Sequence, residues 1–301
     1  MLARRALEKL HTKGAHALMF GLSALLVTVV ACESDDVAPT SRGSTSSTSS
    51  LATSRYLAPV FSDVEMVRDV RYETTPSLAL DVYQPAGDLA AQRPALVWLH
   101  SGGFTAGSKS EGAFIGFPLA FANLGYVTVS IDYRLLSKEQ CVEPLIETSM
   151  CRDAATAAIQ DAQAAVRFLR ANAARYRIDP DRIAVAGESA GAIAATGVGL
   201  HSDDASARVR AWVSISGGSM NGDGVDASDA PGLLIAGTQD PLVPFAWSST
   251  TANAMRAVGV PVELRPLEGP LHVPVDQFGQ LMLDESRDFL YEHLDLASAS
   301  H

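Results

Sequence analysis

The sequence predicts an α/β domain with a mainly parallel central sheet, helices on both faces of that sheet, and antiparallel strands at its N-terminal edge. Short β-rich runs alternate with helical ones from Tyr56 onward, and this alternation is typical of parallel strands joined by crossover helices. Some of the β-rich runs, such as residues 95–99, are apolar throughout, which indicates strands covered on both faces. A chain of 301 residues that is 47% hydrophobic can bury one large core.

The expected elements follow one another in a simple order. Residues 64–72 and 78–83 open the domain as an antiparallel pair, because the turn-forming sequence Thr75-Pro76-Ser77 separates them. Further strands are expected at residues 95–99, 126–131, 182–186, 209–215, 233–236 and 262–267, and helices at residues 111–124, 153–176, 190–200, 246–258 and 276–293. Ligands of such sheets bind at the carboxyl ends of the strands.

The long helix at residues 153–176 is predicted from its periodicity. Its apolar side chains repeat at helical spacing and share one face; they are Ile159, Ala162, Val166 and Leu169. The helix is expected to end before Asp179-Pro180, because the residue before a proline avoids helical geometry.

The first 31 residues predict a signal peptide. Basic residues precede an apolar run over residues 18–31, which is the length of a signal-peptide core and short for a membrane span. The run ends in Val29-Val30-Ala31-Cys32, which resembles the lipobox of bacterial lipoproteins. That resemblance implies cleavage before Cys32 and lipidation of its thiol. An ordinary signal peptide or a short anchor helix remains the alternative.

Residues 32–55 predict a disordered tether. They are rich in Ser and Thr and contain almost no large apolar side chain, so they cannot bury enough surface to offset the entropy of ordering. The chain is thus expected to consist of a signal peptide (1–31), this tether, a folded domain (56–295) and a short tail (296–301). Anchoring by lipid to a membrane of the bacterial envelope, or secretion, follows as the expected location.

The net charge and the cysteines indicate which ligands and cross-links to expect. The formal net charge of -11 disfavours nucleic acid, because an acidic surface repels phosphate backbones. Besides Cys32 the chain has only Cys141 and Cys151, and in an exported protein such a pair suggests one disulfide. Two free buried thiols are the alternative. No metal site is expected, since no histidine lies close in sequence to either cysteine.

The sequence Gly187-Glu188-Ser189-Ala190-Gly191 lies between a predicted strand and a predicted helix. A serine hydroxyl needs exposure, orientation and a base before it acts as a nucleophile. A sharp strand-to-helix turn exposes it, and glycines on both sides relieve the crowding that the turn creates. The pattern alone is a modest signal, but its context is the correct one. Ser189 is therefore the predicted nucleophile.

A second glycine-containing loop, His100-Ser101-Gly102-Gly103-Phe104, directly follows the predicted strand at residues 95–99. Ester cleavage places negative charge on the former carbonyl oxygen, and backbone N–H groups must already point toward it. Gly102 and Gly103, together with Ala190 after the nucleophile, are the predicted donors of this oxyanion hole.

These motifs, with Asp132-Tyr133-Arg134 between them, resemble those of the carboxylesterases and hormone-sensitive-lipase-like enzymes of the α/β-hydrolase fold. The resemblance extends over residues 64–290 and implies hydrolysis of carboxylic esters without a cofactor. The chain departs from the family's His-Gly-Gly-Gly loop at Ser101, which leaves the pair of oxyanion donors less certain.

The base and the acid are predicted from chain order, which in this fold is serine, acid, histidine. Of the seven histidines only His272 lies in a loop after a late strand. Asp240 follows the preceding strand and is the predicted acid, which holds the imidazole tautomer. Glu268 is the reserve candidate for that role.

Other side chains near strand ends have weaker assignments. Four apolar residues are candidates for a substrate pocket, with core packing as the alternative for each: Phe104, Met220, Phe245 and Trp247. Asp132 and Arg134 are expected to brace the sheet edge and the oxyanion loop rather than contact substrate, and Glu188 is expected to have a buried polar partner. Only residues 135–152 could form a small cap.

The predicted function is hydrolysis of carboxylic esters, with short acyl groups, by a Ser-His-Asp triad through an acyl-enzyme. Expected substrates are small-molecule esters or esters on polysaccharides, and the sequence does not indicate an oligomeric state. A serine peptidase of the same fold is the first alternative. A non-catalytic binding module derived from a hydrolase is the second, although such modules usually lose a triad member.

Overall fold

The computed structural model describes residues 55–74, 77–111, 115–136, 149–200, 204–220 and 224–299, all within one compact unit. The described residues include neither the predicted signal peptide nor nearly all of the tether, and they include neither Cys32 nor Cys141. The roles assigned to these parts of the chain therefore stay predictions. No helix in the described ranges combines the length and the apolar character that a membrane span requires.

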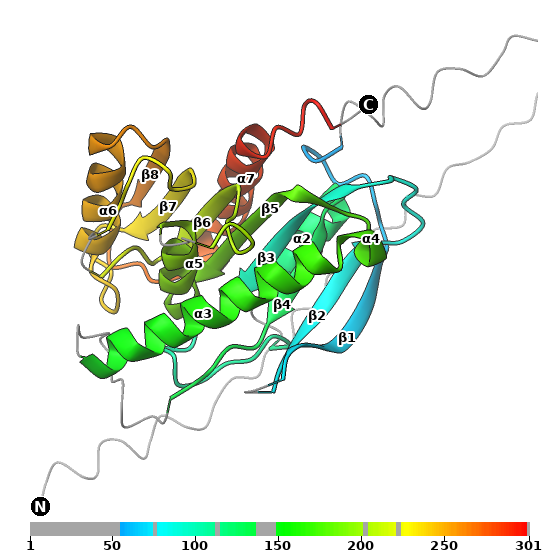
Figure 1. Cartoon of the computed structure of the whole chain (residues 1–301). Helices are drawn as coiled ribbons and strands as arrows, with labels where there is room; N and C mark the ends of the chain where they lie inside the picture. Colours follow the sequence, from blue (N-terminus) through cyan, green and yellow to red (C-terminus); the bar gives the residue numbers. More distant parts are fainter. Residues whose placement is uncertain are drawn as a thin grey trace, which may run out of the picture. The chain divides into compact units, whose positions relative to one another are not determined.

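The fold is built on an eight-stranded sheet (Figure 1) with the strand order β1-β2-β4-β3-β5-β6-β7-β8. Its strands are β1 (Val64–Glu73), β2 (Leu78–Pro85), β3 (Arg93–Leu99), β4 (Val127–Ile131), β5 (Ile178–Glu188), β6 (Ala211–Ile215), β7 (Gly232–Gly237) and β8 (Val262–Leu267). Strands β3 to β8 run parallel, whereas β1 and β2 form the predicted antiparallel edge. The predicted fold class is thereby confirmed.

Helices cover both faces of the sheet. They are α2 (Gly116–Leu124), α3 (Ser149–Ala171), α4 (Ala173–Tyr176), α5 (Ala190–Leu200), α6 (Phe245–Ala257) and α7 (Val275–His293). Alternate residues of each inner strand enter two different cores: Val97 packs with α3, α5 and α6, and its neighbour Trp98 with α2 and α7. Because both faces are covered, β3, β4, β6 and β7 are buried at every position, and most of their side chains are apolar.

Two predicted helices differ from the observed ones. Helix α2 begins at Gly116 rather than at residue 111, because an earlier start would place Pro118 inside the helix, where it lacks an N–H to donate. The long helix breaks at Asn172, with α4 beyond it. The chain then turns at Arg177, which has a left-handed φ of 53°, so β5 begins before Pro180 instead of after it.

The packed domain extends slightly beyond its predicted ends. Arg55, predicted to be the last residue of the tether, donates hydrogen bonds of 3.0 and 2.7 Å to the carboxylate of Asp88. Leu296, predicted to begin the tail, is buried in the core beside α7. Arg55 and Leu296 therefore belong to the packed domain rather than to the tether and the tail. The sequence did not show this, because the contacts join residues that are far apart along the chain.

Candidate active site

Ser189 occupies the sharp turn between β5 and α5. Its φ of 52° is left-handed, a strained conformation for a residue with a side chain. A Cβ at Gly187 would lie 2.5 Å from the backbone of Gly191, and one at Gly191 would lie 2.3 Å from the carbonyl oxygen of Leu99. The turn can therefore form only with glycine at both flanking positions, as the sequence predicted.

The structure brings the three predicted triad residues together. His272 Nδ1 lies 2.8 Å from Asp240 Oδ2, and His272 Nε2 lies 3.0 Å from Ser189 Oγ. A carboxylate only accepts hydrogen bonds, so the imidazole donates from Nδ1 and its Nε2 is free to accept the serine proton. This is the arrangement that general-base activation of a serine requires.

The acid of the triad is fixed by its own loop. Asp240 Oδ1 accepts hydrogen bonds from the backbone N–H groups of Leu242 and Val243, at 2.8 and 2.9 Å. Its side chain is 1% exposed, whereas the reserve candidate Glu268 is exposed and accepts a hydrogen bond from Thr238. The geometry therefore favours Asp240 over Glu268 as the partner of His272.

Ser216 is a site residue that the sequence did not reveal. It follows β6, is buried and has a φ of 56°. Its hydroxyl accepts a hydrogen bond of 2.9 Å from the N–H of Val273, the residue next to His272. Ser216 thus fixes the backbone of the histidine loop. The one available signal was a serine directly after a buried strand, and no motif marked it.

Three consecutive left-handed residues shape the predicted oxyanion loop after β3. Gly102, Gly103 and Phe104 have φ values of 121°, 61° and 61°. A Cβ at Gly102 would lie 2.1 Å from the carbonyl oxygen of Ala106. No backbone acceptor among the described residues takes the N–H groups of Gly102 and Gly103, as the predicted role of oxyanion donors requires.

The segment after β4 holds the oxyanion loop. The hydroxyl of Tyr133 donates a 2.7 Å hydrogen bond to the carbonyl oxygen of His100, and the two rings stack at 4.3 Å. Asp132 accepts a hydrogen bond from the N–H of Lys109, and Arg134 forms an ion pair with Asp161 of α3. Asp132 therefore has the predicted bracing contact beside the oxyanion loop, whereas the contacts of Arg134 are with α3.

Glu188, next to Ser189, is buried, and its carboxyl group is not fully paired. Contrary to expectation, its Oε2 has no hydrogen-bond partner among the described residues. Burial disfavours the charged form and raises the pKa of Glu188 to about 8.

The four predicted pocket residues divide into two groups. Phe104 is fully buried, with its ring against Tyr133, and Trp247 is nearly so. These two pack in the core and do not line an open pocket. Met220 and Phe245 remain partly exposed. The alternative of core packing, which the sequence favoured at least as much, therefore describes Phe104 and Trp247.

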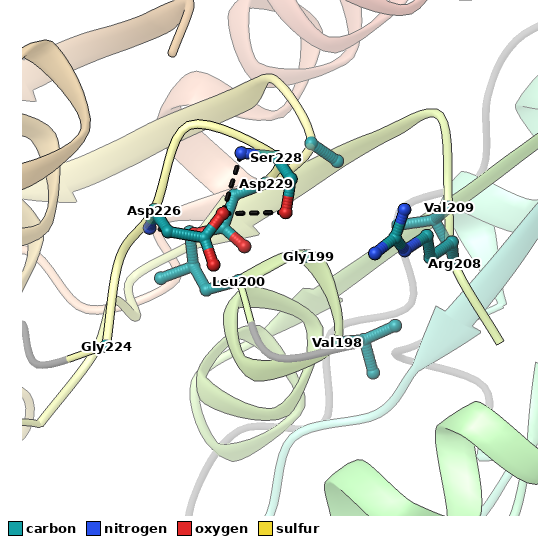
Figure 2. A pocket seen from close by; sticks show the side chains of 10 residues that line it. Val198, Gly199, Leu200, Arg208, Val209, Gly224, Asp226, Ser228 and Asp229 are labelled. Carbon is teal, nitrogen blue, oxygen red and sulfur yellow. Dashed lines mark hydrogen bonds between the residues drawn. The ribbon is translucent and has the colours of Figure 1, made fainter. Parts of the chain in front are cut away.

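A cavity of about 190 Å³ lies elsewhere in the domain (Figure 2), next to the end of α5 and the segments that precede β6 and β7. Its lining includes Gly199, Arg208, Asp226 and Asp229. It is at the amino edge of the parallel strands, opposite the edge that carries the triad. Among the residues that the structure describes, no cluster of histidine, cysteine and acidic side chains could hold a metal ion.

Cys151 is buried in the first turn of α3 and is disulfide-bonded. The predicted partner, Cys141, lies outside the described residues, so the pairing of Cys141 with Cys151 stays a prediction.

Comparisons with known proteins find similarity to esterases. The model of the family described as BD-FAE matches residues 80–213, a range that includes the oxyanion loop and the serine turn but neither Asp240 nor His272. Acetylcholinesterase from Gallus gallus is 36% identical over 144 residues, 48% of this chain and 18% of that protein. Arylacetamide deacetylase-like 2 from Homo sapiens is 31% identical over 146 residues, 48% of this chain and 32% of that protein. The matches thus span a third or less of these relatives.

Solved structures extend the similarity to most of the domain. The thermophilic esterase Est2 from the planctomycete Thermogutta terrifontis is 25% identical, with a TM-score of 0.62 over 76% of this chain and 91% of that one. That esterase is also known phosphorylated by paraoxon, with propionate bound and with butyrate bound. The chain therefore has the α/β-hydrolase fold of carboxylesterases, with a hydrogen-bonded serine, histidine and aspartate at the carboxyl edge of its sheet.

Proposed function

We propose that the protein is a serine esterase that hydrolyses carboxylic esters through Ser189, His272 and Asp240. The observation that carries the proposal is the continuous hydrogen-bonded chain from Ser189 Oγ through the imidazole to Asp240, with the serine on a strained turn. The esterases and deacetylase to which the chain is similar support this reaction class.

The proposed reaction has two halves. His272 Nε2 takes the hydroxyl proton as Ser189 Oγ attacks the ester carbonyl, and the N–H groups of Gly102, Gly103 and Ala190 stabilise the oxyanion. The imidazolium then protonates the leaving alcohol, and Asp240 stabilises its charge. In the second half His272 activates water, which attacks the acyl-enzyme and releases the carboxylic acid and free Ser189.

The test is the substitution Ser189→Ala. Ester hydrolysis and labelling by a fluorophosphonate probe should both be lost, with the far-UV circular dichroism and the melting temperature retained. Labelling that persists in the alanine variant would contradict the assignment. A screen that finds peptide cleavage without esterase activity would favour the peptidase alternative.

The preferred esters have short acyl chains under this proposal. Propionate and butyrate are bound in structures of the similar Est2. In a series of p-nitrophenyl esters, kcat/KM should be highest between acetate and butyrate and decrease for longer acyl chains. A maximum at long chains would refute the preference.

The location is a separate proposal. Lipidation of Cys32 would tether the domain to a bacterial membrane, where it would meet small-molecule esters or esters on polysaccharides outside the cytoplasm. A radiolabelled fatty acid should be incorporated into the protein in a bacterial host, and the label should be absent from the Cys32→Ser variant.

A disulfide between Cys141 and Cys151 is also part of the proposal. Intact mass should show two thiols that become alkylated only after reduction.

A further inference from the structure

A buried lysine lies just beyond the oxyanion loop. Lys109 Nζ is 2.7 Å from Asp69 Oδ1 of β1 and 2.9 Å from Asp81 Oδ1 of β2. The lysine side chain is 7% exposed and that of Asp81 is fully buried. Burial alone would lower the pKa of Lys109, but the hydrogen bonds to the two carboxylates outweigh it and raise that pKa. The side chain is therefore a buried cation held by two anions.

The edge of the sheet is shaped to make this contact. The pairing of β1 with β2 shifts register between Val67 and Val70, and Asp69 within this bulge has a left-handed φ of 55°. The bulge also lets the N–H of Asp69 donate a 2.8 Å hydrogen bond to Asp81 Oδ1. Bulges turn a side chain to a new direction at the cost of regular pairing. Here the turned side chain reaches Lys109.

The backbone of Lys109 is held as well. Its N–H donates a 2.8 Å hydrogen bond to Asp132 Oδ1, directly after β4. At the opposite end of the loop, the carbonyl oxygen of His100 accepts a hydrogen bond from the hydroxyl of Tyr133. In the middle of the loop, the carbonyl oxygen of Phe104 accepts a hydrogen bond of 2.8 Å from the N–H of Leu136. The loop that carries Gly102 and Gly103 is thus fastened at its start, middle and end. At its end the loop is held by the ion pairs of Lys109 as well as by hydrogen bonds.

We propose that Lys109 is a positioning residue for the oxyanion hole, acting through Asp81, Asp69 and Asp132 to hold Gly102 and Gly103 in place. The inference rests on the proposed esterase function. Oxyanion donors act by being preorganised, so a loop that loosens costs rate in the transition state rather than affinity for the substrate. The expected signature is a loss in kcat with little change in KM.

The test compares Lys109→Met with the parent in the full-length protein. The methionine keeps the length of the side chain and removes its charge. With active sites counted by fluorophosphonate titration, kcat per site should decrease at least tenfold and KM should change by less than threefold. The Ki of an aryl trifluoromethyl ketone, which forms a tetrahedral oxyanion on the serine, should increase by the same factor as kcat/KM decreases. Arg265→Met removes an ion pair with Glu285 on the surface and is the matched control, with unchanged kcat.

Three outcomes would overturn the proposal. A titrated kcat within twofold of the parent would show a structural role only, whatever the melting temperature. A lower kcat with an unchanged Ki would place the effect outside the oxyanion hole. If Lys109→Met does not fold, Asp69→Asn tests the proposal instead, because the carboxylate of Asp69 is largely exposed and its loss should not prevent folding. In that variant kcat should decrease two- to fivefold. An unchanged kcat would refute the proposal. If the parent hydrolyses no ester, the proposed function fails separately, and the rate of fluorophosphonate labelling replaces kcat as the readout.

Discussion

Polar side chains form different kinds of contact at the two edges of the parallel sheet. At the carboxyl edge, β5, β6, β7 and β8 are each followed by one residue of the serine–histidine–aspartate network or its support, Ser189, Ser216, Asp240 and His272. At the amino edge, Arg55 is clamped on Asp88, and Arg93 donates to Gln84 and to the carbonyl of Tyr176. The first set converges on one reactive hydroxyl, whereas the second fastens the start of the domain to the sheet.

Neither a hollow nor a left-handed backbone by itself marks the carboxyl edge, because Tyr56, Arg177 and Asp295 near the amino edge also have left-handed φ values, of 70°, 53° and 53°. Ser189, Ser216 and Val273 at the carboxyl edge have left-handed φ values of 52°, 56° and 43°. The cavity in Figure 2 is at the amino edge, and its Asp226 and Ser228 bond to each other. Strain persists only where surrounding contacts impose it, and such positions cluster at functional sites. The comparison teaches that a hollow alone does not identify the reactive edge of this domain.

The sharpest test of the comparison uses one histidine from each edge. His272→Ala should reduce kcat at least about 10³-fold, because the serine loses its base. His293→Ala, at the end of α7 on the amino edge, should leave kcat within about twofold. Steady-state hydrolysis of p-nitrophenyl acetate measures both. Similar losses in the two variants would remove the distinction between the edges.

The unpaired carboxyl at the reactive edge predicts a pH effect on stability. The pKa of Glu188 is about 8 in the folded protein against 4.5 as its ordinary value. Between these values the folded state keeps a proton that the unfolded state releases, so the parent becomes less stable as the pH rises. The loss is at most about 1.4 kcal/mol per pH unit, or several kcal/mol by pH 8.

Glu188→Gln removes that ionisation at nearly constant shape. Its free energy of unfolding should exceed that of the parent by a margin that widens from pH 5 to pH 8, and no further above pH 9. Urea unfolding at four pH values gives the comparison. Parallel pH dependences in the two proteins would mean that Glu188 is ionised in the folded state.

The smallest expected effect concerns the serine that supports the histidine loop. Ser216→Ala leaves the N–H of Val273 without its acceptor and should reduce kcat about tenfold, which corresponds to about 1.4 kcal/mol in the barrier. Ser228→Ala makes the same chemical change beside the amino-edge cavity and is the matched control, with no change in kcat. If the two variants behave alike, Ser216 does not position His272.

Local patterns in the sequence were sufficient for much of the fold and for the outline of the site. The apolar runs predicted the inner strands because both faces of a parallel sheet are covered. The glycines around Ser189 marked the turn, since a Cβ at either place collides with the backbone. Chain order then selected Asp240 and His272, and the structure places His272 within hydrogen-bonding distance of both Asp240 and Ser189.

Tertiary structure alone decided the supporting contacts. The hydrogen bond from Val273 to Ser216 joins residues 57 positions apart, and that from Lys109 to Asp69 joins residues 40 apart. It also decided that Phe104 and Trp247 are buried and that Arg55 and Leu296 belong to the packed domain. Composition and periodicity indicate the secondary structure and burial of a short segment of chain. The supporting contacts depend instead on which distant segment packs against it. The sequence by itself therefore predicted the serine, histidine and aspartate of the network, and only the folded domain determined what holds them in place.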